Sequence, residues 1–264
     1  MRLPIYQVDA FTSRLFGGNP AAVVILEEWL PDKTLQDIAA ENNLSETAFV
    51  VLQAEPFRLR WFTPRVEVDL CGHATLATAF VLFETGRVRG DVVRFQTQSG
   101  ALAVQRGDGL LSMDFPARPP SPVASTDELK AALGAEPREV HLARDLLVVF
   151  DDEGDVAALE PNLDGIAALD VFAVIVTAAG CEADFVSRFF APRVGVPEDP
   201  VTGSAHCSLI PYWSARLQKK KLRAFQLSKR GGEILCEDRG ERVVIGGRAI
   251  QYMRGEITLD ETRR

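Results

Sequence analysis

The sequence has few of the residues that mark disulfide-rich, membrane-spanning or secreted proteins. It contains four cysteines in 264 residues, none of them in a CxxC pair, which excludes a disulfide scaffold and favours reduced thiols. No apolar run reaches the roughly 18 residues that a membrane helix needs, and the start lacks the apolar segment of a secretory signal. We therefore predict a cytoplasmic protein.

Basic residues are outnumbered as well. Lys and Arg total 29 against 37 Asp and Glu, so the formal net charge is −8. Surfaces that bind nucleic acid or anionic membranes usually carry a basic stripe. The one basic run, residues 219–223, falls where a predicted helix ends, and cations interact favourably with that end of a helix. We expect neither a nucleic-acid partner nor a membrane partner.

What the sequence does contain is an internal repeat. Phe62–Val68 (FTPRVEV) matches Phe190–Val196 (FAPRVGV) at a constant offset (190 − 62 = 128), and Gly72 then matches Gly203. Two copies exclude a solenoid, which needs at least about three repeats. The hydrophobic content of 47% is that of an ordinary globular chain, so each copy can build its own core.

The repeat predicts two lobes of similar build. A proline-dense stretch, residues 116–122, lies near the midpoint, so we predict lobes over residues 1–117 and 118–264. Each lobe combines short apolar strands with one main helix, at 72–83 and at 203–218. The predicted fold class is α+β, with a curled, mostly antiparallel sheet around a central helix in each lobe. The pattern leaves open whether the last strand stays in the second lobe or crosses to the first.

Both predicted central helices begin at a glycine, Gly72 in one and Gly203 in the other. Backbone N–H groups at a helix start have no partner within the helix, and glycine admits a ligand close to them, so such an end can bind an anion. Two readings stay open. Either the glycines simply start two packed helices, or both ends hold a small carboxylate in a cleft between the lobes.

Three ionisable residues lie near these glycines or at a strand entrance. His73 opens an apolar helix, and Asp199 precedes a proline as turn or cap residues often do. Glu46 stands at the entrance of an apolar strand, where burial would raise its pKa, as a general acid or base requires. Considered one at a time, each also fits a structural role: a hydrogen-bonded histidine, a turn or cap aspartate, and a solvated glutamate.

Two rival chemistries use the same region. Side chains of metal-ligand type are present at Cys71, His73, Asp199, His206 and Cys207. Their spacings match no zinc pattern, and neighbours on a helix diverge, so we predict no metal site. A pair of thiols across a cleft could racemise a stereocentre, but the repeat places no cysteine opposite Cys71. A cysteine-dependent racemase or epimerase is therefore the second hypothesis.

Seven short segments combine into a specific pattern along nearly the whole chain. They are Tyr6–Thr12 (YQVDAFT), Gly18–Val23 (GNPAAV), Leu44–Phe49 (LSETAF), Phe62–Pro64 (FTP), Val66–Val68 (VEV), Cys71–Thr75 (CGHAT) and Glu198–Ser204 (EDPVTGS). Together they resemble the phenazine-biosynthesis PhzF-like isomerase family. The resemblance implies the diaminopimelate-epimerase-like fold, which agrees with the two lobes expected from the repeat.

The resemblance also implies an activity, a proton shift within a small cyclic amino-hydroxy acid without cofactor or metal, and a homodimer. By resemblance, Glu46 would be the acid/base, and His73 and Asp199 would orient the substrate and stabilise charge. Substrate-binding contacts would come from Asn19, Ser45, Gly72, Gly203 and Ser204.

The motifs do not identify the substrate. The leading hypothesis is a cofactor-independent isomerase of a small cyclic or unsaturated amino or hydroxy carboxylic acid. The alternative from another class is a non-catalytic protein that binds a small carboxylate in the same fold.

Overall fold

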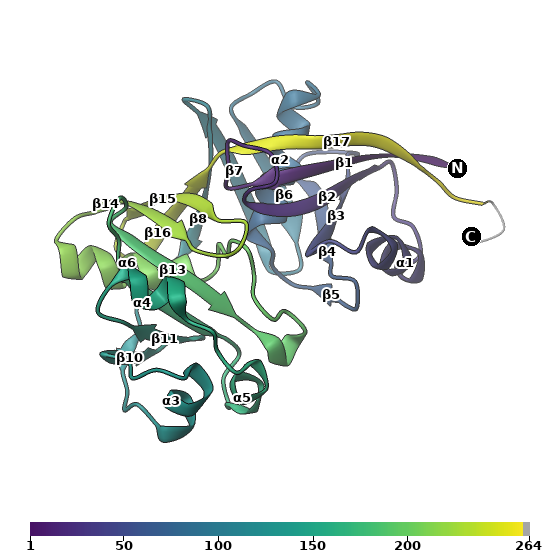
Figure 1. Cartoon of the computed structure of the whole chain (residues 1–264). Coiled ribbons are helices and arrows are strands. Elements are labelled where there is room, and N and C mark those ends of the chain that lie inside the picture. The colour runs from purple at the N-terminus through teal and green to yellow at the C-terminus, as the bar shows by residue number, and fades with distance from the viewer. Residues whose placement is uncertain (261–264) are drawn as a thin grey trace. The chain divides into compact units, whose positions relative to one another are not determined.

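The structure is a computed structural model and describes residues 1–260 (Figure 1). The chain forms two compact units, which we describe one at a time. The first unit contains Met1–Asp114 and residues 246–260, and the second contains Phe115–Ile245. The division lies three residues before the boundary predicted at 117/118 (117 − 114 = 3). The last strand, whose place the sequence left open, belongs to the first unit.

The first unit is built on a mixed, mostly antiparallel set of strands with two helices. The strands are β1 (Arg2–Ala10), β2 (Asn19–Leu26), β3 (Glu46–Val51), β4 (Phe57–Phe62), β5 (Glu67–Val68), β6 (Val92–Thr97), β7 (Gly100–Gly107), β8 (Leu110–Pro116) and β17 (Ala249–Thr258). The helices are α1 (Asp32–Asn42) and α2 (Gly72–Glu84). β1 pairs antiparallel with β2 and with β17, and Figure 1 shows β17, in yellow, running alongside β1. β2 pairs with β3, and β4 with β6, in parallel.

Helix α2 is the buried helix expected from its apolar sequence. Ten of its 13 residues are buried, and it packs against β1, β2, β3 and β17. Its buried threonines are accommodated because their hydroxyls donate to backbone carbonyls one turn back, Thr75 to Cys71 at 2.6 Å and Thr78 to Ala74 at 2.7 Å. A helix that is apolar on all sides needs such surroundings, so the sheet must wrap around it.

The second unit repeats this organisation with more helices. Its strands are β9 (Ser121–Pro122), β10 (Glu139–Leu142), β11 (Leu146–Val149), β12 (Val174–Ala179), β13 (Phe185–Phe190), β14 (Lys221–Gln226), β15 (Gly232–Asp238) and β16 (Arg242–Gly247). Its helices are α3 (Asp127–Leu133), α4 (Glu153–Ala158), α5 (Leu163–Ala168), the 3₁₀ helix η1 (Pro192–Val194) and α6 (His206–Leu217). β11 pairs with β12, and β13 with β14, in parallel; β12–β13 and β14–β15 are antiparallel.

The apolar stretch 140–150 is the hairpin of β10 and β11, because residues 143–145 turn the chain. One expectation for the second unit was wrong: Gly203 does not open the second main helix. A turn with hydrogen bonds from His206 N to Gly203 O (3.0 Å) and Cys207 N to Ser204 O (3.2 Å) leads into α6. Helices α4 and α5 were not predicted.

Pro211 lies inside α6, where a proline removes one hydrogen bond of the helix ladder and can kink the helix. The helix continues through it. Proline has no N–H to give to Cys207 O, four residues earlier, and that carbonyl accepts from Arg118 N at 2.8 Å instead. The Cys207 carbonyl, which has no donor within the helix, is therefore satisfied by a backbone N–H from outside the helix.

Within residues 1–260, no helix is both long enough and apolar enough to cross a membrane.

Candidate active site

The starts of two parallel strands and of one helix bring four of the predicted site residues to one region of the first unit. Asn19 begins β2, Glu46 begins β3, and the register pairs Ala21 with Glu46. Parallel strands start at the same edge of a sheet. Helix α2, which begins with Gly72 and His73, packs against both strands.

Glu46 and His73 form a close, largely buried acid–base pair. His73 Nε2 lies 3.0 Å from Glu46 Oε2, and their side chains are 6% and 15% exposed. On the other side of the ring, Asn19 Nδ2 lies 3.2 Å from His73 Nδ1. The imidazole is therefore held between an amide and a carboxyl group, and Glu46 retains an opening to solvent.

The pKa values in this group follow from burial and from the close contacts. Burial disfavours a charged imidazole, but Cys71 and Glu46 act in the opposite direction and hold the pKa of His73 well above its ordinary value. Burial and the nearby Glu46 raise the pKa of the Cys71 thiol to about 11. Since the raised pKa of Cys71 favours the protonated thiol, Glu46 is the charged neighbour that favours an imidazolium at His73.

Gly72 and Ser45 flank this pair. Gly72 is the first residue of α2, and the N-cap residue before it, Cys71, makes no side-chain capping hydrogen bond. The helix start is therefore the kind of N-terminus that offers backbone donors to an anion. Ser45 immediately precedes Glu46 and is half-buried.

In the second unit, Asp199 lies in a turn fixed by β14. Thr202 Oγ1 donates to Asp199 Oδ2 at 2.5 Å, and Gln226 Nε2 donates to Asp199 O at 2.7 Å. Gln226 Oε1 in turn accepts from Thr202 N at 2.8 Å. Sequence reasoning did not assign Gln226 to the site, although the repeat extends to it: Phe95-Gln96 recurs as Phe225-Gln226 (226 − 96 = 130). Gln226 is 1% exposed, whereas Gln96 is exposed, so only one copy took this role.

Gly203 and Ser204 follow in the same turn. Ser204 Oγ accepts from Arg144 Nη2 at 3.2 Å, and Arg144 also makes a two-point contact with buried Asp145 at 2.9 Å for each bond. The pattern of residues did not point to Arg144. The predicted site residues thus form two groups, one at β2, β3 and α2 in the first unit and one in the turn 199–204 of the second.

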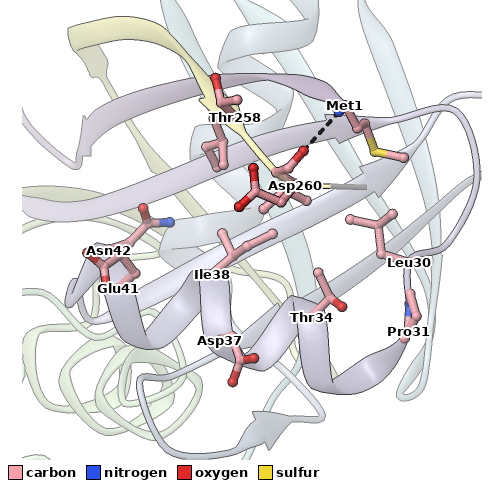
Figure 2. A pocket seen from close by; sticks show the side chains of 12 residues that line it. Met1, Leu30, Pro31, Thr34, Asp37, Ile38, Glu41, Asn42, Thr258 and Asp260 are labelled. Carbon is pink, nitrogen blue, oxygen red and sulfur yellow. Dashed lines mark hydrogen bonds between the residues drawn. The ribbon is translucent and has the colours of Figure 1, made fainter. Parts of the chain in front are cut away.

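The first unit also contains a pocket of about 330 Å³ beside α1. Figure 2 shows Ile38 and Thr34 of α1 on one side and Thr258 and Asp260 on the other, and the amine of Met1 donates to Leu259 O at 2.9 Å. None of the predicted site residues lines this pocket. Glu46 and His73 are a buried, paired acid and base of the kind that proton transfer requires, whereas the shape of this pocket alone indicates no chemistry.

The chain is similar to known proteins along nearly its whole length. The family described as phenazine biosynthesis-like protein matches residues 8–255. A Pseudomonas aeruginosa protein named Uncharacterized isomerase PA3578 is 56% identical over 260 residues, covering 98% of this chain and 100% of that protein. The isomerase class predicted from the sequence is thereby confirmed.

Solved structures confirm the fold. The crystal structure of a phenazine biosynthesis protein of the PhzF family from Enterococcus faecalis has a TM-score of 0.96 and 50% identity, over 98% of this chain and 100% of that one. A Pseudomonas aeruginosa protein called Predicted Epimerase PA4716 shares the fold, with a TM-score of 0.75 at 20% identity over 98% and 100% of the two chains. This chain therefore belongs to the phenazine biosynthesis-like protein family.

Proposed function

We propose that the protein is an isomerase in which Glu46 moves a proton between two carbon atoms of a small cyclic or unsaturated amino or hydroxy carboxylic acid. The observation that carries this proposal is the Glu46–His73 pair, 3.0 Å apart and largely buried. A carboxyl group at the entrance of an apolar strand can reach a substrate while water is mostly kept away.

In the proposed reaction, the Glu46 carboxylate removes a proton from one carbon, and the electron pair of that C–H bond moves into the unsaturated system. The resulting carboxylic acid, which retains an opening to solvent, can exchange its proton with water before it delivers a proton to another carbon, so Glu46 ends as it began. His73, as an imidazolium, stabilises negative charge as it develops. Acid–base transfer by a positioned side chain contributes typically about 10²–10⁴-fold. The reaction so written uses neither cofactor nor metal.

The second-unit residues have binding roles in this proposal. Asp199 would orient the amino or hydroxyl group of the substrate, and Ser204 would hydrogen-bond its carboxylate, together with the backbone N–H groups of Gly72 and Gly203. The fixed position of Asp199, held through Thr202 by hydrogen bonds, supports a role that depends on orientation.

A thiol mechanism is less well supported. Burial raises the pKa of Cys71 and that of Cys207 to about 11, and a protonated thiol neither takes up a proton nor attacks carbon readily. Both thiols are free and buried. Glu46 is the better base at neutral pH for this reason.

The test is solvent exchange. The protein is incubated in D₂O with a panel of small cyclic and unsaturated amino and hydroxy acids, and NMR detects deuterium at carbon. We expect exchange that falls by roughly 10²-fold or more in Glu46→Gln and persists in Cys71→Ala. Glu55→Gln, at a partly exposed glutamate outside the site, is the matched control and should exchange as the wild type does.

Two results would contradict the proposal. Exchange that survives Glu46→Gln and disappears in Cys71→Ala would assign the reaction to the thiol. Saturable binding of an acid, with no exchange into any acid of the panel, would favour a non-catalytic binding protein.

A further inference from the structure

We propose that Cys71, His73 and Glu46 form a binding site for a thiophilic divalent cation of the Zn²⁺ class, and that the bound cation blocks proton transfer. The binding does not depend on the proposed function, whereas the block rests on it. The basis is a thiol, an imidazole and a carboxyl group whose ligand atoms all lie within 4.8 Å of one another. Among residues 1–260, this is the one such group of three.

Sequence spacing alone excluded this convergence, because side chains close together on a helix diverge. Cys71 is not on the helix. It is the N-cap residue of α2, with an extended backbone (φ −142°, ψ 109°), so its side chain can turn back toward His73. Cys71 Sγ lies 3.5 Å from His73 Nδ1 and 4.0 Å from Nε2.

The distances suit a small tetrahedral cation. Zinc bonds of about 2.3 Å to sulfur and about 2.0–2.2 Å to nitrogen and oxygen imply ligand atoms about 3.4–3.6 Å apart. The observed 3.0 Å between His73 Nε2 and Glu46 Oε2, and the 3.5–4.0 Å between sulfur and imidazole, lie on both sides of that value.

The donor set also indicates which cation would bind. A thiol and an imidazole are ligands for zinc and similar metals, whereas Mg²⁺ and Ca²⁺ prefer an all-oxygen shell. A thiolate and a carboxylate together balance two positive charges. Three protein ligands leave a fourth coordination position, and Glu46 provides the opening toward solvent.

An ion at this place would occupy the groups that the proposed reaction needs. It would take the place of the His73 proton against Glu46 and neutralise the carboxylate that acts as the base. The cation is therefore an inhibitor in this proposal and not a cofactor. Chelation should activate protein that was purified with metal bound.

The binding is tested with Co²⁺, whose thiolate charge-transfer and d–d absorption report tetrahedral coordination through sulfur. All variants carry Cys181→Ser, because Cys181 is an exposed thiol that could bind metal by itself. We expect one equivalent of Co²⁺ with a thiolate band, displaced by Zn²⁺ and unaffected by excess Mg²⁺. Cys71→Ser should remove the band and weaken Zn²⁺ binding by roughly 100-fold or more.

Cys207→Ser is the matched control, because Cys207 is likewise buried with a pKa raised to about 11 and lies outside the group of three. It should keep the band. Glu46→Gln keeps the Cys71 thiol, so it should weaken Zn²⁺ binding while retaining the thiolate band. This second variant still tests the site if the Cys71→Ser protein does not fold. The proposed binding site is contradicted if the parent protein shows no thiolate band, or if the band persists in Cys71→Ser.

The inhibitory part has its own test in the solvent-exchange assay. One equivalent of Zn²⁺ should stop exchange, and a chelator should restore it. If exchange continues with Zn²⁺ bound, the inhibition is contradicted, while the binding site itself is not. A protein that exchanges no acid at all contradicts the proposed function, while the Co²⁺ titration still decides the site.

Discussion

Glu46 and His73 stabilise each other in surroundings that would disfavour either charge alone. Burying a charged group costs several kcal/mol unless an opposite charge and hydrogen bonds compensate, at an order of magnitude. His73 has Glu46 at 3.0 Å, which is such compensation. In the proposed reaction, a substrate that separates the pair would meet a base and a cation already in position.

His206 shows the opposite behaviour and leads to a prediction on pH. It is fully buried, and its Nδ1 donates to Thr202 O at 2.8 Å. Burial lowers its pKa to about 4, because the one hydrogen bond to Thr202 offsets only part of the desolvation. The ring is therefore neutral in the folded protein at neutral pH.

The unfolded chain binds this proton near pH 6.5, at about the ordinary histidine pKa. Between about pH 6.5 and about pH 4 the unfolded state thus holds more protons, so the free energy of unfolding falls on acidification. The contribution is complete above about 6.5 and is on the order of 3 kcal/mol. Urea unfolding at several pH values should show this fall in the wild type and a smaller one in His206→Asn. Equal slopes for both proteins would contradict the assignment.

At the scale of an element, the turn 199–204 depends on a side chain from a strand. Gln226 satisfies the Thr202 N–H and the Asp199 carbonyl, and both would be left without this partner in Gln226→Leu. A buried unsatisfied polar group costs about 1–3 kcal/mol, so we expect a loss of at least about 2 kcal/mol in the free energy of unfolding. Exchange activity should fall as well, since Asp199 loses its support.

The repeat supplies the control for that prediction. Gln96→Leu changes the matching residue of the other copy, which is exposed, and should alter the free energy of unfolding by no more than about 0.5 kcal/mol. Urea denaturation of both variants makes the comparison. Equal losses in the free energy of unfolding would mean that the buried contacts of Gln226 contribute no more to stability than the exposed Gln96 does.

Helix α6 ends at a residue in a conformation suited to glycine. Its C-cap, Gln218, has φ 52° and ψ 40°, and the side chain is exposed. The left-handed conformation costs a non-glycine residue roughly 1–2 kcal/mol. Gln218→Gly should therefore raise the free energy of unfolding by about 0.5–1 kcal/mol in urea denaturation. At the C-cap of α2, Thr85 has φ −84°, and Thr85→Gly should give no such gain.

At the scale of the whole molecule, the two ends of the described chain meet in the first unit. β17 pairs with β1 from Arg2–Thr258 to Ala10–Ala249, and the amine of Met1 donates to Leu259 O at 2.9 Å. Residues 1–114 by themselves therefore lack β17, one of the strands of the first unit's sheet. Removing the chain from Arg248 onward would leave β1 without this partner and expose the apolar surface that β17 covers.

We expect that truncation to unfold the first unit and a circular permutant to restore it. The permutant begins at Arg248, continues through β17 and a short glycine linker to Met1, and ends at Gly247. Because the hydrogen bond between Met1 and Leu259 already brings these ends together, the linker needs little reach. Circular dichroism and cooperative urea unfolding should match the wild type. A folded truncated protein would show that β17 is dispensable. The homodimer implied by the resemblance stays a prediction.

Local pattern predicted much of this protein. The apolar run after Gly72 predicted a buried helix, and the proline and acid at 31–32 are typical of a helix start such as that of α1, because both signals act through neighbours along the chain. The repeat predicted two similar units and the α+β class. The motifs pointed to Asn19, Glu46 and His73, which the structure brings together.

The sequence by itself thus determined the local elements, the duplication and the chemical types of the site residues. Only the tertiary structure decided that β17 belongs beside β1, that Gln226 and not Gln96 supports a turn, and that Cys71 meets His73. Each of these depends on which strand pairs with which, or on one residue's backbone angle at a helix start. Hydrophobic periodicity carries no information on either, because it reports which face of an element is buried and not what covers that face.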